Sequence, residues 1–126
     1  ASSAPSIRVL IAEDEAIVRW MLEAEMEDEG HQAVSTIDGL AALERFGSDP
    51  FDLAIIDLGL PGLPGDELAR RLHQIDPSLV TVLISGWSLG KSDSRLEAFD
   101  FYLRKPFGPT EVQNIVNQAV ALRASR

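Results

Sequence analysis

The sequence predicts one doubly wound α/β domain, in which a five-stranded parallel sheet is covered by helices on both faces. Five short aliphatic runs recur along the 126 residues, at positions 7–12, 33–36, 53–56, 80–84 and 101–103. Most of these runs are continuously apolar, which is typical of parallel strands that are buried on both sides. Segments with a helical spacing of apolar residues separate the runs. This alternation of strand and helix predicts right-handed crossovers and a parallel sheet.

The first two crossovers contain predicted helices. In residues 15–29 the apolar residues fall on one side of the helical wheel, which predicts one buried stripe. The stripe consists of Val18, Leu22 and Met26, with Ile17 and Met21 beside them. The second helix is predicted to begin at Asp38, whose side chain suits an N-cap, and to end at Gly47.

The third and last helices have clear boundary signals. The third follows Gly65, carries an apolar stripe that extends to Ile75, and ends before Pro77, because a residue that precedes proline avoids the helical conformation. The last helix has Gly108 as a possible N-cap and Pro109 at its first position. The fourth crossover, residues 87–100, is rich in serine and glycine, so it predicts only a short helix that begins at residue 93 or 94 and ends at 98.

Composition and charge exclude several classes of protein. Hydrophobic residues make up 45% and charged residues 25% of the chain, which is ordinary globular usage, and the net charge of -9 disfavours direct binding of nucleic acid or an anionic membrane. The chain has no cysteine, so disulfides and thiol chemistry are excluded. No apolar run reaches the length of a membrane span, and residues 1–6 resemble a tail or linker rather than a signal peptide, so we expect a cytoplasmic domain. The two histidines, His31 and His73, are expected at the surface.

Polar residues with acidic, hydroxyl and basic side chains follow four of the five predicted strands. They are Glu13, Asp14 and Glu15 after the first strand, Asp57 after the third, Ser85 after the fourth and Lys105 after the fifth. In open parallel sheets, ligands bind beyond the carboxyl ends of the strands, so we expect these side chains to share one site. Each of them alone is more often an ordinary turn, cap or loop residue, but their joint placement favours a functional site.

The clustered carboxylates favour a hard divalent cation. Two carboxylates about 4 Å apart repel each other by about 4 kcal/mol at an effective dielectric constant of about 20, so an ionised cluster needs positive charge nearby. Oxygen ligands without histidine or cysteine suit Mg2+, which also binds phosphoryl oxygens.

Four segments together resemble the receiver domain of two-component response regulators. They are VLIAEDE at 9–15, DLGLPGLPG at 57–65, LISG at 83–86 and YLRKPF at 102–107, in that order at the ends of the predicted strands. The resemblance covers residues 7–126, which we expect to form the receiver domain. It implies a flavodoxin-like fold with strand order 2-1-3-4-5 and a shortened fourth helix.

The resemblance also implies the roles of the site residues. Asp57 would be the phosphoacceptor that takes a phosphoryl group from a histidine kinase or a histidine phosphotransfer protein. Ser85 would donate a hydrogen bond to one phosphoryl oxygen and Lys105 would form an ion pair with another, with the Lys105–Pro106 peptide in the cis form. The metal ligands would be Asp14, Asp57 and the main-chain carbonyl of Gly59, with Glu13 acting through water.

The resemblance further implies how a signal leaves the domain. Tyr102 would be the aromatic switch residue that moves with Ser85, and the signal would pass to a downstream protein or an attached domain. The segment between Ser85 and Lys105 is shorter than the usual family pattern, and this short form is similar to receivers in hybrid sensor kinases, so a domain that passes phosphate onward is an alternative.

Three other interpretations compete with a receiver. A phosphohydrolase with an aspartyl-phosphate intermediate would need an acid two residues after Asp57, where Gly59 stands. A flavodoxin-type cofactor carrier would need a phosphate-binding loop after the first strand. The acidic residues that stand there would instead repel the phosphate of a nucleotide. A pseudo-receiver that serves only for docking is disfavoured by the presence of Asp14, Asp57, Ser85 and Lys105.

Two expectations concern the segment after the fourth strand. By analogy with the family, Gly59 and Trp87 flank the approach of the water that would hydrolyse the aspartyl phosphate, and we expect the indole of Trp87 to fold over the site. Residues 88–94 contain several serines, one glycine and little apolar surface, so we expect this stretch to be mobile.

Overall fold

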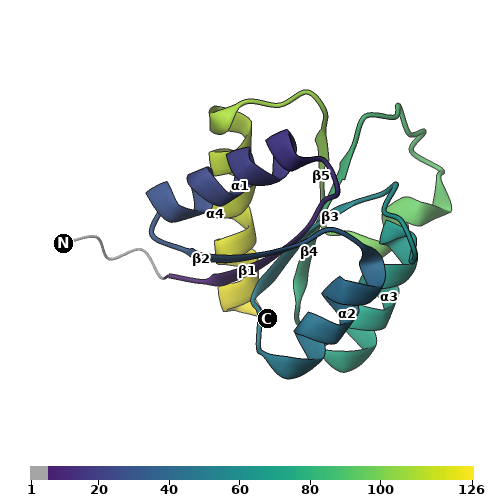
Figure 1. The fold of residues 1–126 in the computed structure, drawn as a ribbon, viewed down its shortest axis with the longest axis horizontal. Coiled ribbons are helices and arrows are strands. Elements are labelled where there is room, and N and C mark those ends of the chain that lie inside the picture. The colour runs from purple at the N-terminus through teal and green to yellow at the C-terminus, as the bar shows by residue number, and fades with distance from the viewer. Residues whose placement is uncertain (1–5) are drawn as a thin grey trace.

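A computed structural model describes residues 6–126 and contains one parallel five-stranded sheet (Figure 1). Its strands are β1 (Arg8–Ala12), β2 (Gln32–Thr36), β3 (Leu53–Asp57), β4 (Val80–Ser85) and β5 (Phe101–Arg104). The strand order is β2-β1-β3-β4-β5 and every neighbouring pair is parallel, which confirms the predicted topology. The prediction for residues 1–6 falls almost entirely on residues 1–5, which lie outside the described part of the chain.

Helices cover both faces of this sheet, as predicted (Figure 1). The helices are α1 (Ala16–Asp28), α2 (Gly39–Ser48), α3 (Gly65–Ile75) and α4 (Pro109–Ser125), together with the short 3-10 helix η1 (Ser94–Ala98) in the fourth crossover. α1 and α4 pack on one face, whereas α2, α3 and the end of η1 pack on the other. The fourth crossover thus carries a shortened helix, although it is 3-10 and not α-helical.

The two apolar layers follow from the alternation of side chains along the strands. In β1, Val9 and Ile11 face α1 and α4, whereas Leu10 and Ala12 face α2 and α3. All five residues of β3 are buried, because the strand lies in the middle of the sheet with helices on both sides. This central position explains why its sequence is a continuous apolar run that ends in Asp57.

Two predicted helix caps are present. Asp38 precedes α2, and its carboxylate accepts a hydrogen bond from the amide of Ala41 at 2.7 Å. Gly108 precedes α4, and its amide donates to the carboxylate of Glu111 at 3.0 Å. Both caps satisfy amides that would otherwise lack a partner at a helix start.

Several side chains differ from the sequence-based predictions. Ile17 and Ile75 were assigned to buried stripes, but they are 79% and 56% exposed because each lies at the margin of its helix's apolar face. His31 was expected at the surface but is buried, and its Nδ1 accepts a hydrogen bond from the amide of Ile7 at 3.1 Å. Gly47 does not end α2, which continues through Ser48.

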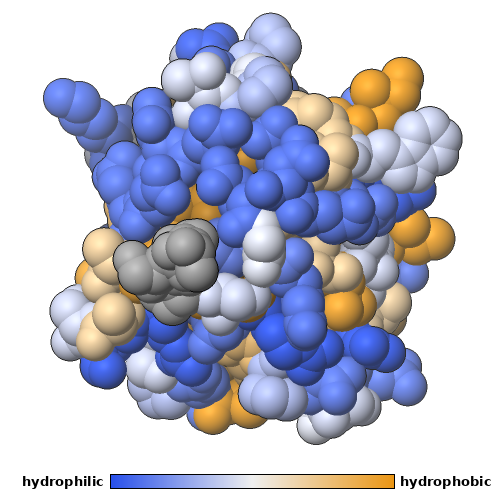
Figure 2. Space-filling model, turned by 90° about the vertical axis from the view of Figure 1, so that its left-hand side faces the viewer, coloured by the Kyte–Doolittle hydropathy of each residue, from blue (hydrophilic) through white to orange (hydrophobic). Residues whose placement is uncertain are grey.

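None of the helices in residues 6–126 is long and apolar enough to cross a membrane. The face of the molecule shown in Figure 2 is covered mainly by hydrophilic side chains, which surround small hydrophobic patches.

Candidate functional site

The polar residues that follow the strands meet in one cleft at the carboxyl edge of the sheet. The cleft has a volume of about 270 Å³ and is lined by Asp14, Glu15, Asp57, Gly59, Ser85, Gly86, Trp87 and Lys105. Glu13 is fully buried and its carboxylate lies close to those of Asp14 and Asp57. Tyr102 does not line the cleft, but it contacts the main chain of Trp87. The fold therefore brings together the residues predicted from four different strand ends.

Asp57 occupies the end of the central strand β3, where two neighbouring elements fix its main chain. The amide of Leu58 donates to the carbonyl of Ile84 in β4, and the amide of Gly65 donates to the carbonyl of Leu58, both at 3.1 Å. Gly65 packs so closely on Asp57 that a Cβ atom at position 65 would overlap the Asp57 carbonyl oxygen. The start of α3 thus holds the Asp57 carboxylate at the floor of the cleft.

Three carboxylates share this floor, and burial disfavours the ionisation of two of them, Glu13 and Asp57. Glu13, Asp14 and Asp57 each place one oxygen within 4.8 Å of the others. Burial raises the pKa of Glu13 to about 7, although Lys105 and the amide of Glu15 act in the opposite direction. Burial also raises the pKa of Asp57, and the charge of Asp14 raises it further, while Lys105 lowers it. The cluster is short of positive charge.

The two oxygens of Glu13 have different partners. Its Oε2 accepts from the amide of Glu15 at 3.2 Å. Its Oε1 is fully buried and lies 2.7 Å from Nζ of Lys105. One ammonium group therefore faces the three clustered carboxylates. A donor set made only of oxygen atoms fits a hard divalent cation such as Mg2+.

Lys105 supplies the positive charge that faces the cluster. Its Nζ lies 2.7 Å from Oε1 of Glu13, 2.7 Å from Oε1 of Glu15 and 3.7 Å from Oδ1 of Asp57. Burial lowers the pKa of Lys105, but the carboxylates of Glu13, Glu15 and Asp57 more than offset this effect and raise it overall. The lysine is therefore charged at neutral pH. The Lys105–Pro106 peptide is cis, as expected.

Ser85, Trp87 and Tyr102 form a connected chain beside the acids. Ser85 is buried at the end of β4, and its Oγ accepts a hydrogen bond from the amide of Trp87 at 3.0 Å. The hydroxyl of Tyr102 in β5 donates to the main-chain carbonyl of Trp87 at 2.6 Å. A hydroxyl in the cleft is thus linked through one residue to the half-buried aromatic ring of Tyr102.

The indole of Trp87 forms one wall of the cleft and leaves the other side open. It faces Gly59, where a Cβ atom would lie 3.8 Å from the six-membered ring, and the guanidinium of Arg95 lies 5.9 Å from the ring centroid. Trp87 is nevertheless 56% exposed. The expected covering arrangement is therefore present only in part, because the ring stands beside the cleft.

The sequence-based prediction assigned no role to two residues of α1 and its preceding turn. Glu15 contacts Lys105, and Arg19 donates from one guanidinium nitrogen to the main-chain carbonyls of Glu13 and Asp14 at 3.0 and 3.3 Å. The spacing of Arg19, one helical turn after Glu15, was a usable signal for the second contact. The strand ends predicted that Glu15 and Lys105 share the site, but not that they contact each other directly, because β1 and β5 are not neighbours in the sheet.

Comparison with known proteins agrees with this geometry. The model of the response regulator receiver domain family matches residues 9–117. The response regulator receiver protein CpdR of Brucella abortus is 34% identical over 113 residues, which are 88% of this chain and 92% of CpdR. The virulence transcriptional regulatory protein PhoP of Salmonella choleraesuis is 37% identical over 109 residues, which are 84% of this chain and 48% of PhoP. The chain thus spans about half the length of PhoP.

Solved structures show the same fold. A CheY-like receiver domain protein from Methanospirillum hungatei superposes with a TM-score of 0.89 at 22% identity, covering 96% of this chain and 98% of its own. The response regulator TrrA of Thermotoga maritima, solved in complex with Mg(2+)-BeF, gives a TM-score of 0.82 at 30% identity. The superposition covers 89% of this chain and 97% of the TrrA chain. With the family model spanning most of the sequence and CpdR matched over nearly its whole length, this chain belongs to the family of response regulator receiver domains of two-component systems.

Proposed function

We propose that residues 7–126 form a phosphoacceptor domain, in which Asp57 takes a phosphoryl group from a phosphohistidine of a histidine kinase or a histidine phosphotransfer protein. The main support is the meeting of Asp57, Ser85 and Lys105 in one cleft, although their strands end far apart in the sequence. The carboxylate of Asp57 is only 3.7 Å from the Lys105 ammonium and opens into the cleft. A nucleophile with an adjacent fixed cation suits in-line transfer of a phosphoryl group.

In the proposed step, one carboxylate oxygen of Asp57 attacks the phosphorus atom of the donor. The new P–O bond forms as the P–N bond to the imidazole breaks, and the imidazole leaves with the electron pair and is reprotonated from water. Lys105 would neutralise charge on one phosphoryl oxygen, and the Ser85 hydroxyl would donate to another. This requires the Ser85 hydroxyl to be directed into the cleft, which its role as acceptor for the Trp87 amide permits.

The residues that would hold Mg2+ are Asp14, Asp57 and the carbonyl of Gly59, with Glu13 behind them through a water molecule. The raised pKa of Glu13 and Asp57 supports this assignment, because a cation would offset the cost of ionising these buried carboxylates. When bound, Mg2+ would supply positive charge to the carboxylates and to a phosphoryl oxygen. Among the relatives compared above, TrrA was solved with Mg(2+)-BeF.

An apolar groove beside the cleft supports a protein as the phosphodonor. The groove has a volume of about 340 Å³ and is lined by Glu15, Ile17, Val18, Met21, Lys105, Pro106 and Phe107. Ile17 is 79% exposed and the neighbouring Trp20 is 61% exposed. Exposed aliphatic and aromatic residues next to a polar site are typical of protein interfaces. The net charge of -9 argues against nucleic acid as a direct ligand.

The output would leave through protein contact with a downstream protein or an attached domain. The hydrogen bond from Tyr102 to the Trp87 carbonyl supports Ser85 and Tyr102 as the linked switch residues, because any shift of Trp87 moves both partners. A receiver of a hybrid kinase that passes phosphate onward would use the same Asp57 chemistry.

The test is to incubate the domain with Mg2+ and acetyl phosphate and to follow both protein labelling and phosphate release. We expect stable labelling at one site. Continuous release of phosphate without labelling would indicate a hydrolase, and absence of both would indicate a docking module; either result would contradict the proposal.

A further inference from the structure

Lys105 has a solvent-exposed ion-pair partner, Glu15. Lys105 contacts three carboxylates, but they differ in how freely they can move. The side chain of Glu13 is fully buried and that of Asp57 is 11% exposed, whereas that of Glu15 is 61% exposed. Glu15 is therefore the one partner of the three that can turn into water at little cost.

The side chain of Glu15 is committed to Lys105 rather than to its own helix. Glu15 occupies the N-cap position of α1, with extended backbone, but its side chain makes no capping hydrogen bond. Instead its Oε1 accepts a hydrogen bond from Nζ of Lys105, which lies 90 residues away in sequence, at 2.7 Å. Glu15 lines both the polar cleft and the neighbouring apolar groove. It thus stands at the rim that an incoming phosphodonor has to pass.

Glu15 and a phosphoryl group on Asp57 would both attract the ammonium group of Lys105. An ammonium group has three hydrogens to donate. In this structure the short contacts of Nζ go to Glu13 and Glu15, and the longer distance of 3.7 Å goes to Asp57. A phosphoryl group on Asp57 would use the third hydrogen of Lys105, and any shift of Nζ toward that group would stretch its ion pair with Glu15. The carboxylate of Glu15 would also repel the anionic donor as it enters the cleft.

We propose that Glu15 is a positioning residue that restrains Lys105 in the unphosphorylated domain and thereby slows phosphorylation of Asp57. This inference rests on the proposed phosphoacceptor function. Replacing Glu15 by glutamine keeps the size of the side chain but removes the charge. The E15Q variant should be phosphorylated by acetyl phosphate about two- to fivefold faster, the range that corresponds to an ion pair with one exposed partner.

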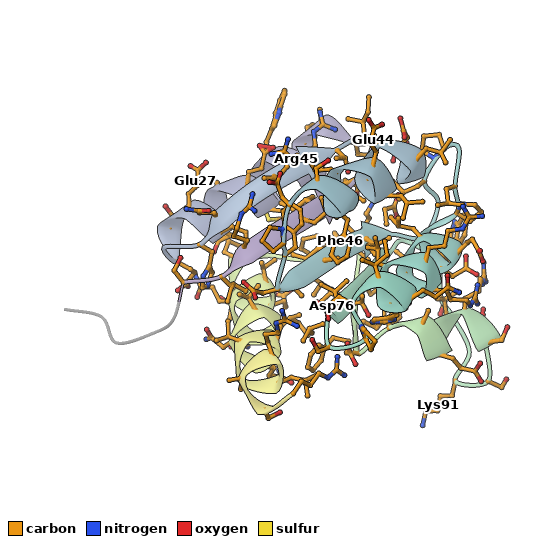
Figure 3. All side chains as sticks on the ribbon, turned by 90° about the horizontal axis from the view of Figure 1, so that it is seen from below. Glu27, Glu44, Arg45, Phe46, Asp76 and Lys91 are labelled. Carbon is orange, nitrogen blue, oxygen red and sulfur yellow. The ribbon has the colours of Figure 1, made fainter. Side chains whose placement is uncertain are left out.

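The chain offers a matched control on the same helix. Glu27 lies near the other end of α1, is exposed and projects away from the body of the domain (Figure 3). E27Q makes the same change in net charge far from the cleft, so its phosphorylation rate should equal that of the unmodified chain. Raising the ionic strength should reduce the advantage of E15Q, because the effect of Glu15 is electrostatic.

A second readout avoids the chemical step. Affinity for beryllofluoride with Mg2+, followed by tryptophan fluorescence, should increase in E15Q and stay unchanged in E27Q, because this phosphoryl mimic also needs Lys105. An unchanged or lower rate in E15Q, with unchanged beryllofluoride affinity, would overturn the role of Glu15. If the unmodified chain takes up neither phosphate nor beryllofluoride, the proposed function itself fails, and the two failures are thereby distinguished.

Discussion

Gly65, the first residue of α3, packs directly on the main-chain carbonyl of Asp57. A Cβ atom at position 65 would overlap that oxygen and would come within 2.9 Å of Cα of Leu58. Both obstacles are backbone atoms, so they cannot rotate away. The position of the Asp57 carboxylate therefore depends on the absence of a side chain at residue 65.

Gly65→Ala should destabilise the domain by about 1–3 kcal/mol, the usual cost of forcing an extra group into a packed region. Gly47→Ala is the matched control, because a Cβ at position 47 meets nothing within 4 Å and the residue lies inside α2. The control should be stabilised by about 0.5–1 kcal/mol, since alanine favours helix more than glycine does. Urea unfolding measures both effects. Equal stability of the two variants would show that α3 does not fix Asp57 in this way.

The raised pKa of Glu13 predicts a specific dependence of stability on pH. A carboxyl group whose pKa rises from 4.5 to about 7 on folding favours the protonated folded state. Its contribution to stability is present below pH 4.5 and is lost as the pH rises through about 7. In EDTA, this contribution should lower the free energy of unfolding between pH 5 and pH 8, and Asp57 contributes in the same direction. The buried His31, whose pKa is lowered by burial, acts in the opposite direction, so the effect of Glu13 is measured as the difference from Glu13→Gln.

Two comparisons isolate this effect. Glu13→Gln should flatten the fall in stability, because the titrating group is gone. Added Mg2+ should stabilise the unmodified chain more at pH 8 than at pH 5, since it binds the ionised carboxylates, and Asp14→Ala should weaken this response. A stability in EDTA that rises with pH to the same extent in both the unmodified chain and Glu13→Gln would refute the assignment.

Trp87 should slow the loss of phosphate from Asp57. Its indole walls one side of the cleft opposite Gly59, which has no side chain to orient a water molecule. Trp87→Ala should accelerate dephosphorylation by about two- to fivefold, which corresponds to a change of about 0.5–1 kcal/mol in the barrier. The decay of labelled protein after removal of the donor measures this rate. An unchanged or slower decay would indicate that Trp87 serves a partner-binding surface instead.

The segment 88–94 should exchange its amide hydrogens faster than the strands. The amide of Asp93 donates to the carbonyl of Gly90 at 3.0 Å, and the carboxylate of Asp93 binds Arg95 at the start of η1. Before Asp93 the segment is largely exposed, and Lys91 extends from it into solvent (Figure 3). Few packed apolar contacts accompany these bonds, so local opening costs little. Hydrogen exchange followed by mass spectrometry checks this, and protection in 88–94 equal to that in β3 would contradict it.

The fold was predictable because each of its signals is local. Continuous apolar runs marked the buried strands, and Asp38 and Gly108 marked helix starts that the structure contains. The exposure of Ile17 and Ile75 was not predictable in the same way, because it depends on how far the neighbouring elements extend over each helix. The burial of His31 likewise accompanies its hydrogen bond with Ile7, a contact between the residue before β1 and the turn before β2.

The site was predictable only as far as strand ends determine it. The common edge of a parallel sheet was sufficient to place Asp14, Asp57, Ser85 and Lys105 together. The common edge was not sufficient to predict which of these side chains contact each other, because those contacts join residues at the ends of strands that are not neighbours. Glu15 reaches Lys105 past two intervening strands, and no spacing in the sequence encodes that contact.

The most direct measurement of the central claim is the site of phosphorylation. The domain is incubated with Mg2+ and acetyl phosphate, and the modified residue is located by mass spectrometry of its peptides. We predict one phosphoryl group, on Asp57, and its complete loss in Asp57→Asn, while the exposed residue Asp28 can be changed to asparagine without effect. Labelling of Asp57→Asn at the rate of the unmodified chain would contradict the account.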